Sequence, residues 1–363
     1  MKIATIVGTR PHFIKAAPVS QAIEAAGLRE IIIHTGQHYS DNMDRVFFDE
    51  LGLAQPHYRF DVNNAGHGRM VGRMVEAVTT VLADEKPEWV LVYGDTNTSL
   101  AGALAAKILG LKLVHVEAGL RSFDPSMQEE VNRVLIDRIS DLLVCPTDKA
   151  MSNLRAEGFP LGSGRMVNCG DVMLDAARLF ATRAYRPSGM AHISPDSFFL
   201  ATVHRAENTN HLARLESIFT ALETLARDRP VVLPLHPRTR KVLEGMDYDF
   251  SASALTMIEP VGYLEILWLL ENCALLVTDG GGLQKEAYFM SSPCVTLRNS
   301  SEWTELLDIG ANVLADADTA VIVKSVDTML GAQIDFNRPL YGNGDAAERM
   351  VQEIIEYSAG EKR

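Results

Sequence analysis

Short apolar runs alternate with longer amphipathic segments along almost the whole chain. The apolar runs form two series, at 3–7, 30–34, 89–93, 112–116 and 142–145, and then at 198–202, 231–235, 274–277 and 294–297. Between them the apolar spacing predicts helices, for example over 70–83, 97–109, 215–227 and 263–271. Strands buried on both faces and separated by helices are typical of parallel sheets with right-handed crossovers. The pattern therefore predicts an α/β fold with two doubly wound, Rossmann-like domains.

The two series set the expected domain boundaries. We expect an N-terminal domain over residues 1–172 and a C-terminal domain over 173–344. A last helical pattern, within 345–363, has no strand after it and is able to pack on either domain. The segment 183–195, with two prolines and little periodicity, is expected to be a linker or the start of the second domain. A length of 363 residues fits two domains better than one.

Charge and cysteine content narrow the class of partner. The formal net charge is −13 and the pI is near 5.3, which argues against nucleic acid but still permits a small anionic ligand. The four cysteines form no C-x-x-C pair, so neither a zinc site nor a disulfide framework is expected. No apolar run approaches the ~20 residues that span a bilayer, and no signal peptide is evident. We expect a soluble, cytoplasmic protein with no membrane partner.

Polar residues follow most of the apolar runs directly. Those in the first half are Arg10, Gln37, Asp95 and Glu117, and those in the second half are His204, His236 and Asp279. In an open parallel sheet, ligands bind beyond the carboxyl ends of the strands. If the two sheets turn these ends toward each other, the site is a cleft between the domains. The set suits phosphate binding and proton transfer.

Each of these residues also has an ordinary structural interpretation. Asp95 precedes Thr96 and Asn97 and is suited to cap a helix. His204 alone is compatible with a buried core position, and His236 with a structural role at a strand end. It is the succession of such groups at seven strand ends that favours a functional site.

Two loops are suited to hold an anion. Gly280, Gly281 and Gly282 leave a strand and enter a helix, so backbone N–H groups can approach a diphosphate at the positive helix end. Glu286, in that helix, is suited to ribose hydroxyls or simply to the helix dipole. The other loop contains Arg10 and is followed by Lys15, which offers two cations to one anion. P-loop and dinucleotide fingerprints are both missing from the sequence, so ATP hydrolysis and NAD binding are poorly supported.

Taken in order, the motifs resemble those of a known enzyme family. They are Gly8-Thr9-Arg10-Pro11 with Lys15, Gly36-Gln37-His38, Gly94-Asp95-Thr96, His115 to Arg121, Glu129-Glu130-x-Asn132-Arg133, His204-Arg205-x-Glu207-Asn208 and Gly281-Gly282-x-Gln284-x-Glu286. Over residues 1 to about 315 the chain resembles the non-hydrolysing UDP-N-acetylglucosamine 2-epimerases. Arg10–Ala17 and Gln284–Phe289 are similar to the branch acting on UDP-2,3-diacetamido-2,3-dideoxyglucuronic acid.

The resemblance implies a GT-B-like fold, usually in a homodimer, that needs no cofactor or metal. It also implies a reaction in which UDP is eliminated to leave a glycal, C2 is reprotonated from the other face and UDP then returns to the sugar. The implied role of this reaction is the supply of surface-polysaccharide precursors. The implied catalytic residues are Asp95, Glu117, Glu129, His204 and Lys15. The implied binding residues are Arg10, Gln37, His38, Arg133, His236, Gly280, Gly281, Gly282 and Glu286, with Gln37 and His38 in the family's effector region. The first domain is expected to carry the catalytic side and the second to bind UDP.

The chain departs from the family pattern at three places. Gly280 stands where a serine is usual, Gln128 stands where a proline is usual, and residues 299–301 replace an acidic stretch. The motifs also allow two other activities. One is a hydrolysing 2-epimerase that releases UDP and free sugar, and the other is a GT-B glycosyltransferase. A non-catalytic sensor of nucleotide sugars is disfavoured because the three carboxylates at 95, 117 and 129 are all retained.

Overall fold

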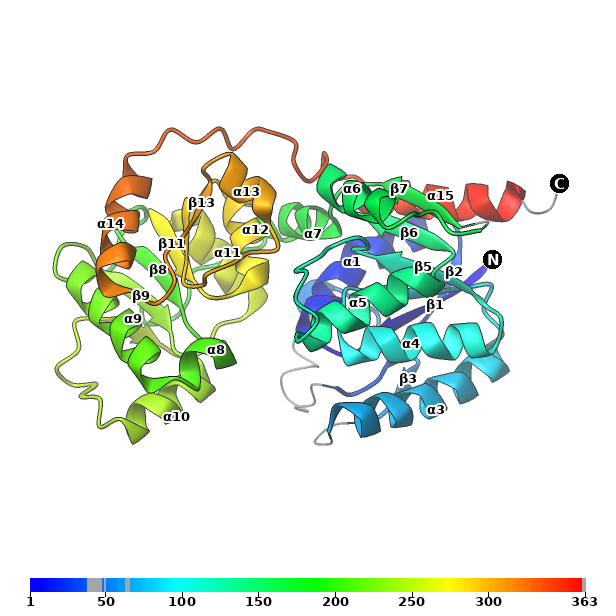
Figure 1. Ribbon diagram of the computed structural model, residues 1–363, viewed down its shortest axis with the longest axis horizontal. Coiled ribbons are helices and arrows are strands. Elements are labelled where there is room, and N and C mark those ends of the chain that lie inside the picture. The colour runs from blue at the N-terminus through cyan, green and yellow to red at the C-terminus, as the bar shows by residue number, and fades with distance from the viewer. Residues whose placement is uncertain (38–47, 49, 63–65, 163, 361–363) are drawn as a thin grey trace. The chain divides into compact units, whose positions relative to one another are not determined.

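The computed structural model describes residues 1–37, 48, 50–62, 66–162 and 164–360. The chain forms two compact units (Figure 1). The first comprises Met1–Leu179 and Pro339–Arg363, and the second comprises Phe180–Arg338. The divisions therefore fall several residues from the expected boundaries at 172 and 344, because α7 (Val172–Ala181) runs across the first of them.

The first unit is built on a seven-stranded parallel sheet. Its strands are β1 (Lys2–Val7), β2 (Arg29–His34), β3 (Tyr58–Arg59), β4 (Trp89–Tyr93), β5 (Lys112–Val116), β6 (Leu142–Cys145) and β7 (Arg165–Asn168). They lie in the order β3-β2-β1-β4-β5-β6-β7. Every residue of the central strand β4 is buried, as expected for a strand covered on both faces.

Helices cover both faces of this sheet. They are α1 (Arg10–Ala25), α3 (His67–Glu85), α4 (Asn97–Ile108), α5 (Gln128–Ile139), α6 (Asp148–Ala156), α7 and α15 (Ala346–Gly360). On one face Val78 of α3, Leu100 of α4 and Ile136 of α5 pack in one core with alternate residues of β1 and β4. Trp89, which points to the other face, contacts α15.

Helix α15, whose packing the sequence left open, belongs to the first unit. The indole N–H of Trp89 donates a hydrogen bond to Ser358 Oγ at 2.8 Å. The ring of Tyr357 meets the Trp89 ring edge-on, with the ring centres 5.3 Å apart. The end of the chain thus returns to the sheet with which the chain began, as the red helix in Figure 1 shows.

The second unit repeats this plan with six parallel strands. They are β8 (Phe199–Thr202), β9 (Val231–Pro234), β10 (Thr256–Ile258), β11 (Leu275–Thr278), β12 (Cys294–Thr296) and β13 (Asn312–Leu314), in the order β10-β9-β8-β11-β12-β13. The helices are α8 (Ala206–Thr209), α9 (Leu212–Leu225), α10 (Pro237–Gly245), α11 (Tyr263–Asn272), α12 (Gly281–Phe289), α13 (Thr304–Asp308) and α14 (Thr319–Leu330). Residues of α9 and α14 pack in one core, and residues of α11 and α12 in another.

Both sheets reverse their strand order next to their first strand. In the first unit the order reverses between β1 and β4, and in the second between β8 and β11. Such a reversal opens a crevice at the carboxyl ends of the two strands, where ligands of doubly wound folds bind. The predicted fold class, two doubly wound parallel-sheet domains, is confirmed. Among the described residues, no helix is both long and apolar enough to cross a membrane.

We expect the substitution Tyr357→Ala to destabilise the first unit by about 3 kcal/mol, because it removes a buried ring and leaves a cavity against Trp89. Urea denaturation measures the loss, and peptide-level hydrogen exchange assigns it to residues 1–179. Glu356→Ala, one residue away on the exposed side of α15, is the control and should change the free energy of unfolding little. Equal losses in the two variants would contradict the role given to the Trp89 contact.

Candidate functional site

Asp95 lies at the carboxyl end of β4, at the reversal point of the first sheet. Its carboxylate accepts a hydrogen bond from Arg133 Nη2 of α5 at 2.6 Å. Its backbone carbonyl accepts another from Asn132 Nδ2 at 2.8 Å. The cap of α4 is Thr96, whose hydroxyl accepts from Ser99 N. Asp95 therefore does not serve as the helix cap, and its carboxylate faces Arg133 instead.

The surroundings of Asp95 raise its pKa. Burial is the largest cause and disfavours the charged carboxylate. The Arg133 and Lys15 cations oppose this effect, whereas the Glu117 and Glu129 carboxylates add to it. The three predicted acids therefore share one electrostatic neighbourhood, and Asp95 holds its proton to higher pH than an ordinary aspartate.

Glu117 follows β5 and forms an ion pair with Lys15 of α1. The side chains of Lys15 and Glu117 are only 10% and 9% exposed, so water screens the pair weakly. The backbone of Glu117 is in the left-handed region, with φ of 75°, which is strained for a residue with a long side chain. A strained backbone that aims a buried carboxylate at a cation is typical of functional positions.

Gly94 keeps these groups close together. Its φ is +60°, and a Cβ added there would lie 3.1 Å from Glu117 Oε2 and 3.5 Å from Lys15 Nζ. Only glycine combines this backbone conformation with such a close approach. The turn at Gly94 thus connects Asp95 on one side with the Lys15–Glu117 pair on the other.

The other predicted residues of the first unit have different environments. Gln37 Oε1 accepts hydrogen bonds from Thr98 N at 2.9 Å and Thr98 Oγ1 at 2.8 Å, which fastens the end of β2 to the start of α4. Arg10 is the first residue of α1 and is partly exposed. Glu129 is exposed in the first turn of α5. His38 lies outside the described residues.

Asp279, at the end of β11, organises the reversal point of the second sheet. It is fully buried, and its carboxylate accepts hydrogen bonds from His204 N, Arg205 N and Asn208 Nδ2 at 2.9 to 3.2 Å. Its Oδ1 also lies 3.3 Å from His204 Nδ1. The sequence showed Asp279 as a strand end but not as a site residue. The signal that could have identified Asp279 as a site residue is its position directly before three glycines at the end of a strand.

His236 combines a structural role with a place beside His204. Its Nδ1 accepts from Arg238 N at 3.2 Å and so caps α10. Its ring centre lies 5.5 Å from that of His204. Burial, and then the neighbouring His204 and Arg238, lower its pKa, which favours the neutral ring. The structural interpretation of His236 therefore holds, and the ring also lies at the predicted site.

The glycine loop enters α12 in a fixed conformation. Gly280 N donates to Thr278 Oγ1 at 2.9 Å, and Trp303 Nε1 donates to Gly281 O at 3.0 Å. A Cβ added at Gly280 would lie 3.3 Å from both His204 Cε1 and Thr278 Oγ1. A Cβ on Gly282 would meet nothing within 4 Å, so backbone is accessible there. Glu286, one turn further along α12, is 6% exposed.

A family model described as UDP-N-acetylglucosamine 2-epimerase matches residues 21–355. The chain belongs to the UDP-N-acetylglucosamine 2-epimerase family. It is therefore an enzyme of the isomerase class, as the motifs of the sequence predicted. The predicted site residues are not tested by this match and stay predictions.

Relatives of the epimerase family match over nearly their full length. A protein of Pseudomonas aeruginosa named UDP-2,3-diacetamido-2,3-dideoxy-D-glucuronate 2-epimerase is 51% identical over 98% of this chain and 100% of its own. A UDP-N-acetylglucosamine 2-epimerase of Methanocaldococcus jannaschii is 41% identical over 98% of this chain and 99% of its own. The crystal structure of an M. jannaschii UDP-GlcNAc 2-epimerase in complex with UDP-GlcNAc and UDP has a TM-score of 0.89 and 40% identity, covering 98% of this chain and 100% of that one.

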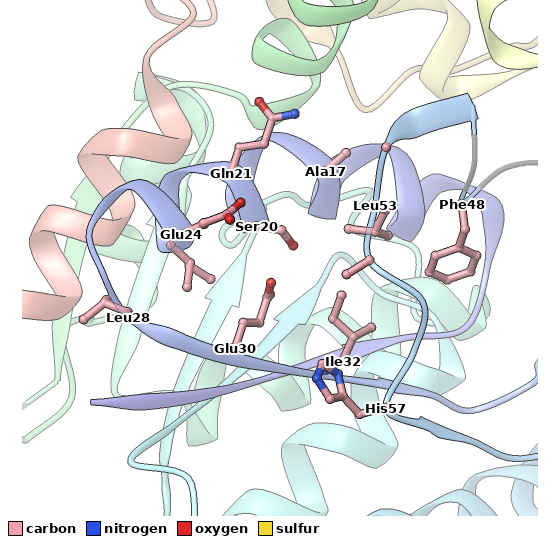
Figure 2. A pocket seen from close by; sticks show the side chains of 13 residues that line it. Ala17, Ser20, Gln21, Glu24, Leu28, Glu30, Ile32, Phe48, Leu53 and His57 are labelled. Atoms are coloured by element: carbon pink, nitrogen blue, oxygen red, sulfur yellow. The ribbon is translucent and has the colours of Figure 1, made fainter.

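A pocket of about 580 Å³ lies in the first unit between α1, β2 and the segment before β3, and it contains none of the residues predicted for the epimerase site. Figure 2 shows Ser20 of α1 and Glu30 of β2 pointing toward each other across it. The Thr5 hydroxyl donates to the Glu30 carboxylate. Burial is the main cause that raises the pKa of Glu30, and the hydrogen bonds of Thr5 and Ser20 oppose it.

The raised pKa of Glu30 makes the stability of this epimerase-family chain depend on pH. The protonated Glu30 carboxyl stabilises the folded state, and this stabilisation is fully present below the unfolded pKa of about 4.5. It is lost as the pH rises through the folded pKa. Glu30→Gln removes the ionisation, so its melting temperature should rise relative to wild type more at pH 8 than at pH 4.5. Glu24→Gln, on the exposed part of the pocket wall, is the matched control in calorimetry. The same difference at both pH values for Glu30→Gln would refute this assignment.

Proposed function

We propose that the chain inverts C2 of a UDP-linked 2-acetamido sugar by eliminating UDP and adding it back to a glycal. The observation that carries the proposal is the arrangement around Asp95. A carboxyl with a raised pKa is paired with Arg133, and a second carboxylate, Glu117, is paired with Lys15 across the Gly94 turn. Two carboxyl groups thus lie in one place, and one of them, Asp95, holds its proton to higher pH than an ordinary aspartate.

The chemistry explains why two such groups are needed. The C2 proton is not next to a carbonyl, so it becomes acidic only as the C1–O bond to UDP breaks. Loss of UDP and of the proton leaves a C1=C2 double bond. Delivery of a proton to the other face of C2 and return of the UDP oxygen to C1 give the epimer. Asp95, Glu117 and Glu129 are proposed to carry the protons, and the raised pKa of Asp95 suits this residue to hold a proton for delivery.

UDP is assigned to the strand ends that carry cations and histidines and to the glycine loop. The backbone of Gly280, Gly281 and Gly282 stands at the start of α12, where the helix dipole favours a diphosphate. His204 lies beside this loop, held through Asp279, and assists UDP departure and return together with Lys15. Arg10 is proposed to bind the diphosphate and Glu286 the ribose. Gln37 and His38 are proposed for an effector, and His236 lines the site.

The substrate is proposed to be UDP-2,3-diacetamido-2,3-dideoxyglucuronate, with UDP-GlcNAc as the second candidate. The relative from P. aeruginosa that carries the first name is 51% identical over nearly the whole chain. The relative named for UDP-N-acetylglucosamine is 41% identical. We place the reaction in the cytoplasm, in the supply of precursors for surface polysaccharide.

Incubation of the protein with each UDP-sugar in D₂O, followed by NMR, tests the proposal. We expect deuterium at C2 of an intact UDP-sugar of either configuration. Free sugar with UDP would instead identify a hydrolysing 2-epimerase. Transfer of the sugar to an added acceptor without C2 exchange would identify a glycosyltransferase. Lack of exchange with both sugars would refute the proposal for those substrates.

The substitution Asp95→Asn should lower C2 exchange by at least about 100-fold, which is the usual contribution of a general acid–base group. UDP binding, measured by calorimetry, should change little, because Asp95 is not among the groups assigned to UDP. Asp148→Asn, at an exposed carboxylate in the first turn of α6, is the matched control. Exchange at the wild-type rate in Asp95→Asn would remove Asp95 from the catalytic set.

The chain is also proposed to form a homodimer through α4 and α5. These helices pack against each other and lie side by side in Figure 1. They leave apolar side chains in solvent, namely Leu104, Ile108, Val131 and Leu135, of which Ile108 is 64% exposed. Exposed apolar residues that gather on neighbouring helices are typical of protein interfaces.

The double substitution Ile108→Glu and Leu135→Glu should convert the dimer to monomer, because it places charges within an apolar interface. Light scattering coupled to gel filtration gives the mass. Leu330→Glu, at a similarly exposed leucine of α14, is the control and should leave the mass unchanged. If the double variant keeps the wild-type mass, or wild type is a monomer, this interface is wrong.

A further inference from the structure

A buried polar network lies beneath the loops that carry Asp95 and Glu117. It joins His115 of β5, Asp137 of α5 and Arg121, whose side chains are at most 1% exposed. Arg121 also forms a two-pronged hydrogen bond with Glu157, at 2.6 and 2.8 Å. None of these residues has been given a role in the proposed reaction. Fully buried polar groups are costly unless they are satisfied, so the arrangement requires an explanation.

The bonds of His115 end on the turn before Asp95. Its Nε2 lies 2.8 Å from Gly94 O. A carbonyl oxygen only accepts, so Nε2 carries a proton and donates it, and Nδ1, which faces the Asp137 carboxylate, is a donor as well. Its Nδ1 lies 2.6 Å from Asp137 Oδ1, and this contact fixes the ring in the orientation that aims Nε2 at Gly94. Carboxylate–histidine pairs set ring orientation in this way elsewhere in proteins.

The same aspartate also holds the turn after Glu117. Asp137 Oδ2 accepts from Gly119 N at 3.2 Å and from Arg121 Nη1 at 2.7 Å. Glu117 itself has the strained φ of 75°, which persists only where the surrounding bonds determine the backbone. Asp137 is therefore connected to the loops of both carboxylates, to one through His115 and to the other directly.

We propose that His115 is a positioning residue: with Asp137 it fixes the Gly94 peptide and thereby the relative placement of Asp95, Glu117 and Lys15. The inference rests on the proposed function, because it concerns the proton-transfer groups of that reaction. A Cβ on Gly94 would lie 3.1 Å from Glu117 Oε2, so even a small movement of this turn alters the distance between the two acids. Misplacement of reacting groups by about 1 Å can lower the rate ~100-fold.

Two substitutions separate the bond to Gly94 from the bond to Asp137. A glutamine amide nitrogen at position 115 reaches the place of Nε2 and can donate to Gly94 O. An asparagine amide nitrogen reaches only the place of Nδ1, keeps the contact with Asp137 and leaves Gly94 O without this donor. We expect His115→Asn to lower kcat about 10- to 100-fold, with KM and the Kd of UDP within about twofold of wild type. His115→Gln should recover most of the rate.

Asp141→Asn is the matched control for a merely structural effect. Asp141 also fastens β5, through a hydrogen bond from Leu113 N at 2.8 Å, but at the other end of the strand. It should lower the melting temperature while leaving kcat near wild type. Wild-type kcat in His115→Asn, equal losses in the asparagine and glutamine variants, or rate losses that follow melting temperature in all three variants would each overturn the proposal.

Amide hydrogen exchange tests the same proposal without substrate. Exchange at residues 94–96 and 117–119 should be faster in His115→Asn than in His115→Gln or wild type. If wild type fails to exchange C2 of either UDP-sugar, the proposed function fails, and this measurement still decides whether His115 holds the turn. Equal exchange in the two variants would overturn the positioning role on its own.

Discussion

Carboxylates that lie close together repel each other, and the carboxyl end of the first sheet tolerates this repulsion because cations are interleaved with the acids. Glu117 is paired with Lys15 and Asp95 with Arg133. At an effective dielectric constant of about 20, two unit charges 4 Å apart interact by about 4 kcal/mol. Removal of Lys15 would therefore leave the nearly buried Glu117 carboxylate uncompensated, and removal of Arg133 would do the same to the partly buried Asp95. The pKa of Asp95 is nevertheless raised, mainly by burial and further by the Glu117 and Glu129 carboxylates, because the Arg133 and Lys15 cations offset these effects only in part.

The cations and acids come from elements far apart in the sequence, and the strand order is what gathers them. Lys15 follows β1, Asp95 follows β4 and Glu117 follows β5, and these strands are neighbours in the sheet. The second sheet has the same reversal, and there His204 follows β8 while Asp279 follows β11, its neighbour. In both units a glycine at the end of the strand beyond the reversal, Gly94 or Gly280, admits a side chain from the adjacent loop to close range.

The sequence predicted the central strands well and the edges poorly, for a physical reason. The strands that the pattern missed are β3, β7, β10 and β13, which are the outermost strands of the two sheets. An edge strand is solvated along one side, so it needs no continuous apolar run and leaves no periodic signal. The cap of α4 was assigned to Asp95 as one alternative because Asp and Thr are both good caps. Only the fold shows that Thr96 fills that role and frees Asp95.

The departures from the family pattern can be understood only from contacts that a sequence does not display. Gly280 leaves room for the His204 ring, since a side chain there would begin 3.3 Å from His204 Cε1. Ser301, within the stretch that replaces the usual acids, donates to Gln284 Oε1 at 2.6 Å, and Gln284 Nε2 in turn donates to Gly280 O. The glycine and the serine are therefore connected through one glutamine. The two departures from the family pattern therefore belong to one hydrogen-bonded group. These two departures therefore lie together at the start of α12, whereas the first unit keeps the three carboxylates at 95, 117 and 129.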